Sequence, residues 1–367
     1  MNPAALPTAV SCAIRITPLP SHASPQISIV IVNYRQWGNT ARLTRQLLAS
    51  ESSRRGAAEV VIVDNHSPVH IVRRRLRRMP GVSMRCFAQN RGFARGVNEG
   101  CRLSRGDWFL LLNPDVSMSP GQLDGVLEHA EQIRAGDPKA GVIGFQLRHA
   151  DGSRQGSVGK FPTLCRALIG LLRPRAERRC PSPLSRERGN VAWVSGCGLL
   201  VHRDCWRQLG GFDPRFFLYY EDVDFCRRAR AAGWSVWFEP ALRLIHARPL
   251  HTREVRARLR LLTRHALLSY AGKHWPVWEF RAVTAMIWLE ALVREHRSRQ
   301  RGSELSATLF RRLRGLAADF WCGRPDRAYR RAWRTGQIQN PVAPQSPIPN
   351  LNLELTAARL QNLRTAC

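Results

Sequence analysis

Acidic residues are scarce in this chain of 367 residues, which has 27 Asp and Glu against 57 Lys and Arg. The resulting formal charge of +30 points to polyanionic surroundings, such as nucleic acid, an anionic membrane surface or phosphorylated substrates. With 44% hydrophobic and 23% charged residues, the composition excludes a disordered chain. We therefore expect a globular protein with one large domain or two smaller ones.

Three targeting and framework signals are missing. The ten cysteines contain no CxxC pair and no His/Cys cluster at zinc spacing, which favours reduced thiols in a cytoplasm over a disulfide framework. The first 25 residues lack the charged start and unbroken apolar run of a signal peptide. No stretch approaches the roughly 20 apolar residues needed to span a bilayer. These absences predict a cytoplasmic protein, either free or peripheral on the inner face of the cytoplasmic membrane.

Short β-branched runs alternate with helical patterns in the first third of the chain. Strands are expected at 27–32, 59–64, 82–87 and 107–112, with helices between them at 40–50, 69–79 and 93–104. Such alternation predicts an α/β fold with a mostly parallel sheet flanked by helices. The first strand runs into "NYRQWGN" and not into GxGxxG, which argues against a nicotinamide-dependent dehydrogenase.

Polar side chains follow each of these four strands, namely Asn33-Tyr34, Asp64-Asn65, Gln89-Asn90 and Asn113-Pro114-Asp115. Open α/β sheets bind ligands at this carboxyl edge. Asn and Asp also favour turns and caps, so a single pair fits a turn equally well. Four in succession favour a site.

Two motifs at this edge suggest phosphate and metal binding. In "NRGFARGVNEG" (90–100), Gly92 lies at a loop–helix junction where backbone amides can approach a phosphate. In "LLLNPDV" (110–116), Asp115 could hold a hard divalent ion, since Mg²⁺ characteristically uses one or two carboxylates together with substrate phosphates. A lone Asn-Pro-Asp is also a common turn, and both interpretations stay open on this motif alone.

The segment "FFLYYEDVDFCRR" (216–228) places Glu221, Asp222 and Asp224 behind a run of aromatics. Carboxylates near a helix N-terminus suit the helix dipole, and Asp224 is expected to cap or to pair with Arg227 or Arg228. Desolvation by neighbouring aromatics would also raise a carboxylate pKa, as a catalytic base requires. Capping and catalysis are compatible.

The rest of the chain is less regular. A strand is expected at 142–147, a strand broken by two glycines at 191–201, and two short strands at 234–239 and 242–246. Basic helices are expected from 254 to 335, followed by a Pro-rich stretch (341–349) and a short amphipathic helix.

Taken in order and spacing, six segments resemble the family-2 glycosyltransferases of the GT-A fold, particularly the bacterial rhamnosyltransferase-like branch. They are "SIVIVNY", "VVIVDNHS", "NRGFARGVNEG", "FLLLNPDV", "WVSGCGLLVHRDCWRQLGGFDPRFFLYYEDVDFCRRARAAGW" and "RLIHA". The resemblance implies a GT-A domain over 26–250, with a nucleotide-binding half (26–118) and an acceptor half (119–250). Around it we expect an unstructured segment (1–25), a basic helical extension (251–335) and a Pro-rich linker with a short helix (336–367).

The resemblance also assigns roles to matching residues. Residues expected at the donor nucleotide are Val32, Asn33, Tyr34, Asp64, Asn90, Arg91, Gly92 and Asn113. Asn113-Pro114-Asp115 matches a DxD-type motif whose first Asp is here Asn, which makes Asp115 the main ligand of Mg²⁺ or Mn²⁺. Trp193, Ser195, Gly196 and Glu221 would lie on the acceptor side, with Asp222 as the catalytic base.

His246 would reach the metal or the diphosphate from the far side. Here the chain departs from the family, because "HARPLHT" (246–252) has Arg248 and Pro249 where relatives often have glycines. His246 is therefore equally compatible with a metal ligand and with an ordinary packed histidine.

The implied activity is inverting transfer of a sugar, with dTDP-rhamnose as the expected donor, to a polysaccharide or lipid-linked acceptor. The Arg-rich C-terminal third, with Trp275, Trp278, Trp288 and Trp321, suits helices lying on an anionic bilayer. The alternative is a polyanion-binding protein with a vestigial transferase pocket. The sequence lacks the basic recognition helix or spaced aromatics of a nucleic-acid module, so nucleic acid is not an expected partner.

Overall fold

The computed structural model of the protein describes residues 24–172, 187–247 and 257–334. Of the expected segments 1–25 and 336–367, only residues 24 and 25 are described. Arg248 and Pro249 also lie outside the described residues. The described strands are β1 (Ile27–Asn33), β2 (Ala58–Asp64), β3 (Val82–Cys86), β4 (Trp108–Leu112), β5 (Val116–Ser117), β6 (Ala140–Arg148), β7 (Arg154–Gln155), β8 (Val158–Gly159), β9 (Gly189–Asn190), β10 (Trp193–Val194), β11 (Gly198–His202) and β12 (Ser235–His246).

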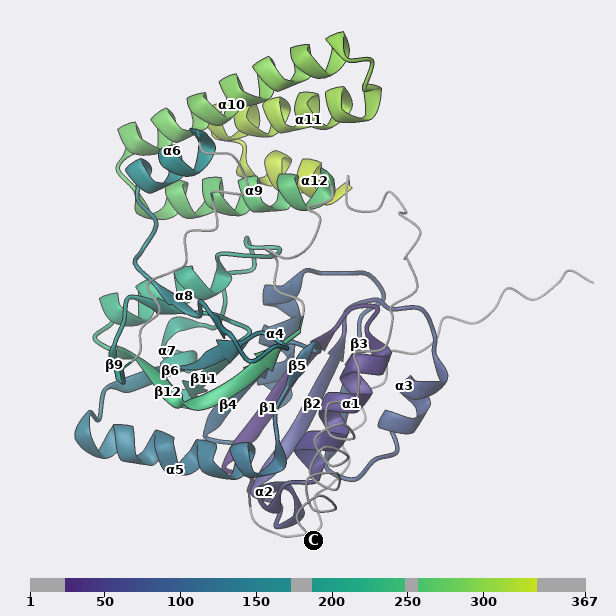
Figure 1. Cartoon of the computed structure of the whole chain (residues 1–367), viewed down its shortest axis with the longest axis vertical. Helices are drawn as coiled ribbons and strands as arrows, with labels where there is room; N and C mark the ends of the chain where they lie inside the picture. The colour runs from purple at the N-terminus through teal and green to yellow at the C-terminus, as the bar shows by residue number, and fades with distance from the viewer. Residues whose placement is uncertain (1–23, 173–186, 248–256, 335–367) are drawn as a thin grey trace, which may run out of the picture. The chain divides into compact units, whose positions relative to one another are not determined.

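The helices up to the end of the sheet are α1 (Trp37–Leu48), α2 (Glu51–Arg54), α3 (Ile71–Leu76), α4 (Phe93–Leu103), α5 (Pro120–Gly136), α6 (Leu164–Leu172), α7 (Arg203–Leu209) and α8 (Glu221–Ala231). Four more follow β12, namely α9 (Ala257–His274), α10 (Val277–Gln300), α11 (Glu304–Trp321) and α12 (Pro325–Arg334). Figure 1 shows these elements along the chain.

The main sheet has the strand order β3-β2-β1-β4-β11-β6-β12-β5. Its first four strands pair in parallel, as the alternating sequence pattern predicts. β11 then runs antiparallel between β4 and β6, so the sheet is mixed in its second half. The predicted α/β fold class is confirmed.

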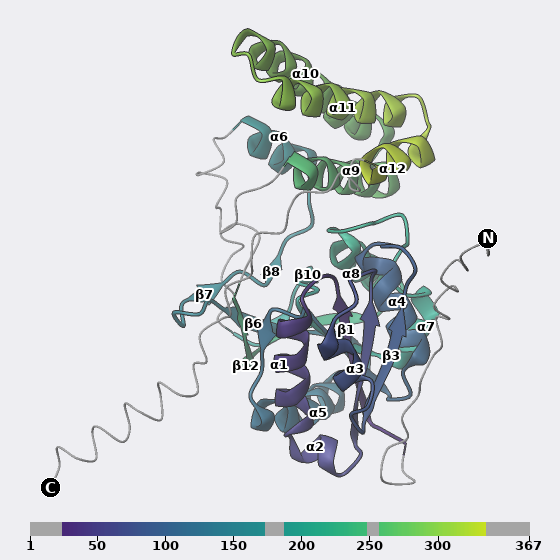
Figure 2. The same cartoon turned by 90° about the vertical axis from the view of Figure 1, so that its right-hand side faces the viewer.

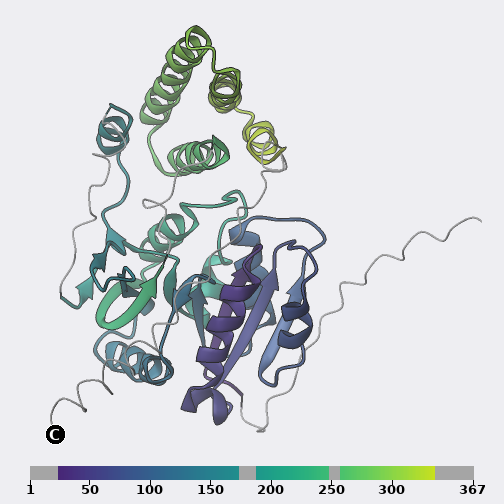
Figure 3. The same cartoon turned by 45° about the vertical axis from the view of Figure 1, so that its right-hand side comes forward.

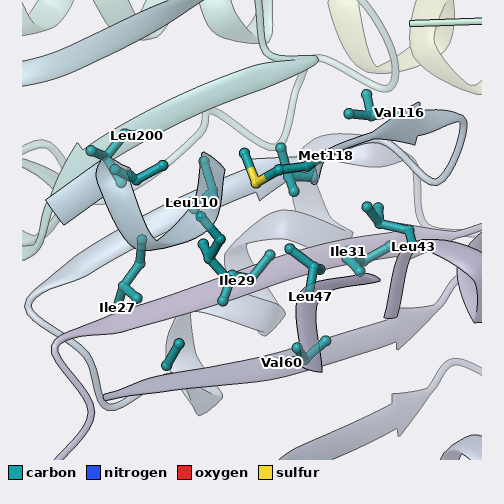
Figure 4. Close-up of a cluster of buried hydrophobic side chains, with 14 of the residues drawn as sticks. Ile27, Ile29, Ile31, Leu43, Leu47, Val60, Leu110, Val116, Met118 and Leu200 are labelled. Carbon is teal, nitrogen blue, oxygen red and sulfur yellow. The ribbon is translucent and has the colours of Figure 1, made fainter. Parts of the chain in front are cut away.

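Helices cover both faces of the sheet, and successive side chains of β1 point to opposite faces. Ile27, Ile29 and Ile31 belong to one buried cluster with residues of α1 and α5, drawn in Figure 4. Val30 and Val32 belong to a second cluster with residues of α4, α7 and α8. Figure 2 shows α1 and α4 on opposite sides of β1.

Three boundaries differ from the sequence prediction. Helix α1 begins at Trp37 and not at residue 40, because the buried Trp37 and its turn continue the apolar face. The expected strand 191–201 is two strands, since residues 195–197 turn between β10 and β11. The two expected strands 234–239 and 242–246 are one strand, β12, whose pairing with β6 shifts register between Glu239 and Arg243.

The four C-terminal helices share one apolar core, to which Phe217 of the preceding segment also contributes. They are drawn in green to yellow in Figure 3. Among the described residues, none of the helices is long and apolar enough to cross a membrane.

Candidate active site

The polar ends of β1 and β2 are bonded to each other. Asn33 and Asp64 are register partners, and Asn33 Nδ2 donates to Asp64 Oδ1 at 2.9 Å. The same amide group donates to Ser67 Oγ at 3.0 Å, and its oxygen accepts from Thr40 Oγ1 at 2.9 Å. The N–H of Gln36 also donates to that oxygen, at 3.1 Å. These bonds use the donors and acceptor sites of the Asn33 amide, which therefore fixes Asp64 and the start of α1.

Asp64 is buried at this edge of the sheet. Desolvation raises its pKa, and hydrogen bonds from Ser67 and Asn33 only partly oppose this effect. Asp64 is thus a rigidly held carboxyl group with acceptor capacity left for a ligand hydroxyl.

The loop before α4 is held by Asn65, a residue to which the sequence prediction gives no role. Asn65 Nδ2 donates to the carbonyl oxygen of Gly92 at 3.0 Å, and Oδ1 accepts from the N–H of Arg91 at 2.7 Å. Gly92 has a φ of +88°, and a Cβ there would lie 2.7 Å from the carbonyl oxygen of Phe217. The N–H of Phe93 donates to that same oxygen at 2.7 Å. The expected donor loop is therefore locked onto the aromatic segment that leads into α8.

The other residues expected at the donor differ in exposure. Val32 is buried, Tyr34 and Asn90 are half-buried, and Arg91 is exposed. Asn90 Oδ1 accepts from the N–H of Gly92 at 2.9 Å. Tyr34, Asn90 and Arg91 therefore retain surface at the sheet edge, whereas Val32 contributes to the core.

Asp115 and His246 meet where β5 and β12 pair. His246 is the register partner of Val116, and its Nε2 lies 3.6 Å from Asp115 Oδ1. Both side chains are buried. The other ring nitrogen, Nδ1, lies 3.1 Å from Gln155 Nε2. Two residues that are 131 positions apart in the sequence are thus brought together.

The charge state of His246 follows from its neighbours. Burial alone would lower its pKa, but Asp115 and Cys197 raise it to about 10. The imidazolium and Asp115 therefore form an ion pair. Among the described residues, no group of three or more His, Cys, Asp or Glu side chains is arranged to hold a metal ion by itself.

Gly196 and Cys197 connect this pair to the acidic helix. Cys197 Sγ lies 3.6 Å from both ring nitrogens of His246 and accepts a hydrogen bond from Asn113 Nδ2 at 3.3 Å. One residue earlier, the N–H of Gly196 donates to Asp222 Oδ2 at 2.8 Å. The turn between β10 and β11 thus contacts both groups of expected catalytic residues.

Asp222 is half-buried in the first turn of α8. Its Oδ1 accepts from the N–H of Val223 at 2.8 Å, so each carboxylate oxygen is fixed by one backbone amide. Desolvation raises the pKa of Asp222, and the hydrogen bonds from Gly196 and Val223 lower it by less. The result is an oriented carboxylate that is more basic than a free one and that keeps lone pairs for a substrate proton.

Its neighbour Glu221 is only 4% exposed. Within the described part of the chain, Glu221 Oε2 has no hydrogen-bond partner. Desolvation, followed by the charge of Asp222, raises the pKa of Glu221 well above its usual range. Such a buried, unsatisfied oxygen is costly unless a ligand completes it.

The backbone before α8 is strained. Tyr219 and Tyr220 have φ values of 72° and 67°, a left-handed conformation that costs a non-glycine residue roughly 1–2 kcal/mol. Strain of this kind collects at functional sites when the surroundings enforce it. Here the enforcement includes the packing of Tyr220 on Tyr270 of α9, with ring centroids 5.5 Å apart.

Asp224 ties α8 to the C-terminal helices. Its side chain is fully buried; Oδ2 accepts from Arg228 Nε at 2.8 Å, as predicted, and Oδ1 lies 2.7 Å from both Lys273 Nζ and His274 Nε2. Desolvation would raise the pKa of Asp224, but these three groups together lower it. Arg227 Nη1 also donates to the hydroxyl of Tyr270, at 3.1 Å. The extension therefore supports the helix that carries Asp222.

Trp193 and Ser195, which are expected on the acceptor side, lie at the turn between β10 and β11. Trp193 is half-buried in β10, and its Nε1 donates to the carbonyl oxygen of Lys160 at 3.0 Å. The N–H of Ser195 donates to the carbonyl oxygen of Ser157 at 2.8 Å. Both residues are fixed by backbone contacts near Gly196.

Comparison with known proteins identifies the family of this chain. The sequence profile described as "Glycosyltransferase like family 2" matches residues 25–267. The chain belongs to the family-2 glycosyltransferases. Its enzymatic class, a glycosyltransferase of the rhamnosyltransferase-like branch, is therefore as predicted.

Two relatives and one solved structure to which this glycosyltransferase is similar are as follows. The N-acetylglucosaminyl-diphospho-decaprenol L-rhamnosyltransferase of Mycobacterium tuberculosis is 32% identical over 244 residues, which cover 60% of this chain and 75% of that protein. The rhamnosyltransferase WbbL of Escherichia coli K12 is 28% identical over 41% of this chain and 56% of its own length. The solved mannosyltransferase PcManGT of Pyrobaculum calidifontis, in complex with GDP-Man and Mn²⁺, is 17% identical and covers 89% of this chain and 90% of its own, with a TM-score of 0.47.

Proposed function

We propose that this glycosyltransferase transfers rhamnose, with inversion, from a nucleoside diphosphate such as dTDP to a polysaccharide or lipid-linked acceptor at the inner face of the membrane. The observation that carries the proposal is the contact series from Asp115 through His246, Cys197 and Gly196 to Asp222. The choice of sugar and of acceptor is supported by the names of the two rhamnosyltransferase relatives, one of which acts on a diphospho-decaprenol-linked sugar.

The donor nucleoside would lie along the carboxyl ends of β1, β2 and β3. The carboxylate of Asp64, held in place by Asn33, is available to accept a hydrogen bond from the ribose or the base of the nucleoside. The loop at Asn90, Arg91 and Gly92 supplies the half-buried Asn90 and the exposed Arg91. Asn65 is a positioning residue, since both of its hydrogen bonds go to this loop.

The residues at β5 and β12 fit a divalent cation. Asp115 supplies a buried carboxylate, and one or two protein ligands suffice for Mg²⁺ when diphosphate oxygens and water complete its shell. His246 can ligate through Nε2 only when Nδ1 carries the proton. Gln155 Nε2, a donor, lies 3.1 Å from Nδ1, so the Gln155 amide would have to turn over to bring its Oε1, unpartnered within the described residues, to that proton. When bound there by Asp115 and His246, Mg²⁺ or Mn²⁺ would neutralise charge on the departing nucleoside diphosphate.

Asp222 would act as the general base. The acceptor hydroxyl gives its proton to the carboxylate as its oxygen attacks the anomeric carbon. The bond between that carbon and the diphosphate oxygen breaks on the opposite side, which inverts the configuration. The amides of Gly196 and Val223 hold the carboxylate in position throughout.

Glu221 would complete the acceptor site. Its unpartnered Oε2 is buried beside Asp222 and is protonated more readily than a free carboxyl group. In that form it can donate to an acceptor oxygen, while Trp193 offers a half-buried ring surface on which a sugar can stack.

A thermal-unfolding panel tests the donor site. The chain is heated with dTDP, UDP or GDP, each in Mn²⁺ and in EDTA. A nucleotide present at about 100 times its dissociation constant stabilises the folded state by about 2.7 kcal/mol. A rise in the unfolding midpoint with dTDP that disappears in EDTA supports the proposal. An unfolding midpoint that none of the three nucleotides raises contradicts it.

A further inference from the structure

Helix α10 has apolar residues on two opposite faces. The face within the helical core buries Val283, Ile287 and Ala291. The other face exposes Trp278, Leu289 and Val293 to 66%, 55% and 41%. A helix that is apolar all round is normally covered on every side, so this outward face lacks a cover among the described residues.

A groove of about 510 Å³ runs between α10 and α11 beside this face. Its apolar part is formed by Met286, Leu289, Val293 and Phe310. Its basic part lies one to two turns further along α10 and contains Arg297 and Arg301. The groove therefore changes from apolar to cationic along the helix.

Arg297 and Arg301 are exposed and free to bind an anion. Neither guanidinium forms a hydrogen bond or ion pair within the described residues. Arg294, by contrast, is engaged, with its Nε 3.1 Å from Glu290 Oε1. Basic residues near a helix C-terminus also suit the helix dipole, but the dipole does not account for the exposed Leu289 and Val293.

We propose that this groove and the outward face of α10 are the docking surface for an anionic lipid bilayer. Lipid phosphates would bind Arg297 and Arg301, acyl chains would cover Leu289 and Val293, and the ring of Trp278, on the same face, would lie at headgroup level. The complementarity is between a strongly basic chain, +30 overall, and anionic headgroups. Nucleic acid satisfies the arginines but leaves the aliphatic residues in water.

This surface belongs to the helices that hold α8 through Asp224. If the acceptor is lipid-linked, a point that rests on the proposed function, docking would bring acceptor and Asp222 to the same membrane. The docking itself needs neither donor nor acceptor, and it can be measured without either.

The test is flotation of the full chain with vesicles of phosphatidylglycerol and phosphatidylcholine, against vesicles of phosphatidylcholine alone. We expect binding to the anionic vesicles only. R297E/R301E should weaken vesicle binding at least about tenfold, because each basic residue near an anionic bilayer strengthens binding by roughly fivefold. L289S/V293S should weaken it as well, by removing the buried apolar contact.

Matched variants elsewhere separate a site from a general effect. R74E/R75E makes the same charge change on the exposed face of α3, and V69S/I71S removes two aliphatic side chains that are 76% and 57% exposed. Both should bind vesicles like the unmodified chain, and unchanged unfolding midpoints show that all four variants fold. Equal losses in R74E/R75E and R297E/R301E would overturn the proposal, as would binding of duplex DNA without binding of vesicles.

Discussion

The N–H of Gly196 donates a hydrogen bond of 2.8 Å to Oδ2 of Asp222. This bond joins the turn after β10 to the first turn of α8, two segments 26 residues apart in the sequence. The next residue, Cys197, contacts His246, which in turn contacts Asp115. The orientation of the proposed base is therefore set by the same turn that borders the proposed metal ligands.

Gly92→Ala should destabilise the protein and weaken nucleotide binding. The φ of +88° disfavours any side chain by roughly 1–2 kcal/mol, and the new Cβ would lie 2.7 Å from the carbonyl oxygen of Phe217. The unfolding midpoint should fall by several degrees. Gly121→Ala is the matched control, since nothing lies within 4 Å of a Cβ there and Ala favours the helix. Equal midpoints for the two variants would contradict the close packing of Gly92 on Phe217.

The sheet edge illustrates what the sequence can predict. Asn33 and Asp64 each end a β-branched run, and parallel strands place such ends side by side, so their proximity follows from pattern alone. The role of Asn65 does not follow, because its partners lie in a loop 26 and 27 residues away whose path depends on tertiary packing. The contact of Gly92 with Phe217 is hidden for the same reason.

Asp224→Asn should lower both stability and transfer. The substitution leaves Arg228, Lys273 and His274 without their buried partner, and breaking a buried pair in this way costs about 3–5 kcal/mol. Because the folded pKa is lowered, the stabilisation from Asp224 is present above the unfolded pKa and is lost as the pH falls through the folded value. Denaturant unfolding at neutral and acid pH measures the loss of stability and its pH dependence, and the rate of sugar transfer is measured separately. The matched control is Asp326→Asn, at an exposed position of α12, which should unfold with the same free energy as the unmodified chain. If Asp224→Asn lost no more stability than this control, the proposed link between α8 and α9 through Asp224 would be refuted.

Glu221→Gln should change the pH dependence of stability. The folded pKa of Glu221 is raised, so its contribution is most favourable below the unfolded pKa of about 4.3 and declines as the pH rises through the folded value. Gln cannot ionise and escapes this decline. The free energies of unfolding of the two proteins should therefore diverge with rising pH, in favour of the variant. Parallel curves would show that Glu221 is not held in an unfavourable site.

Asp115→Asn tests the cation site. If Asp115 is the main protein ligand, the variant heated with dTDP and Mn²⁺ should show no rise in its unfolding midpoint, as expected for the unmodified chain in EDTA. His246→Gln should retain part of the Mn²⁺-dependent shift, because Asp115 remains. An undiminished shift in Asp115→Asn would place the cation elsewhere.

The acidic helix shows the limit of sequence reasoning more clearly. The pattern of aromatics and acids predicts a catalytic carboxylate in this segment, and the family resemblance selects Asp222 for that role. The pairing of Asp224 with Arg227 or Arg228 is also predicted, and the structure has it with Arg228. The pattern does not reveal that Lys273 and His274 bond Asp224 from α9, some 50 residues away. It also does not reveal the left-handed Tyr219 and Tyr220, since such strain is imposed by packing and opposes local propensity.

The most direct test of the account is the rate of dTDP release from dTDP-rhamnose by Asp222→Asn, measured with a lipid-linked acceptor and beside donor affinity. Loss of a positioned general base should slow transfer by about 10²–10⁴ while the dissociation constant for dTDP stays unchanged. Asp204→Asn, on the exposed surface of α7, should transfer at the normal rate. Transfer by Asp222→Asn near the unmodified rate, with donor binding intact, would contradict the assignment of Asp222 as the base.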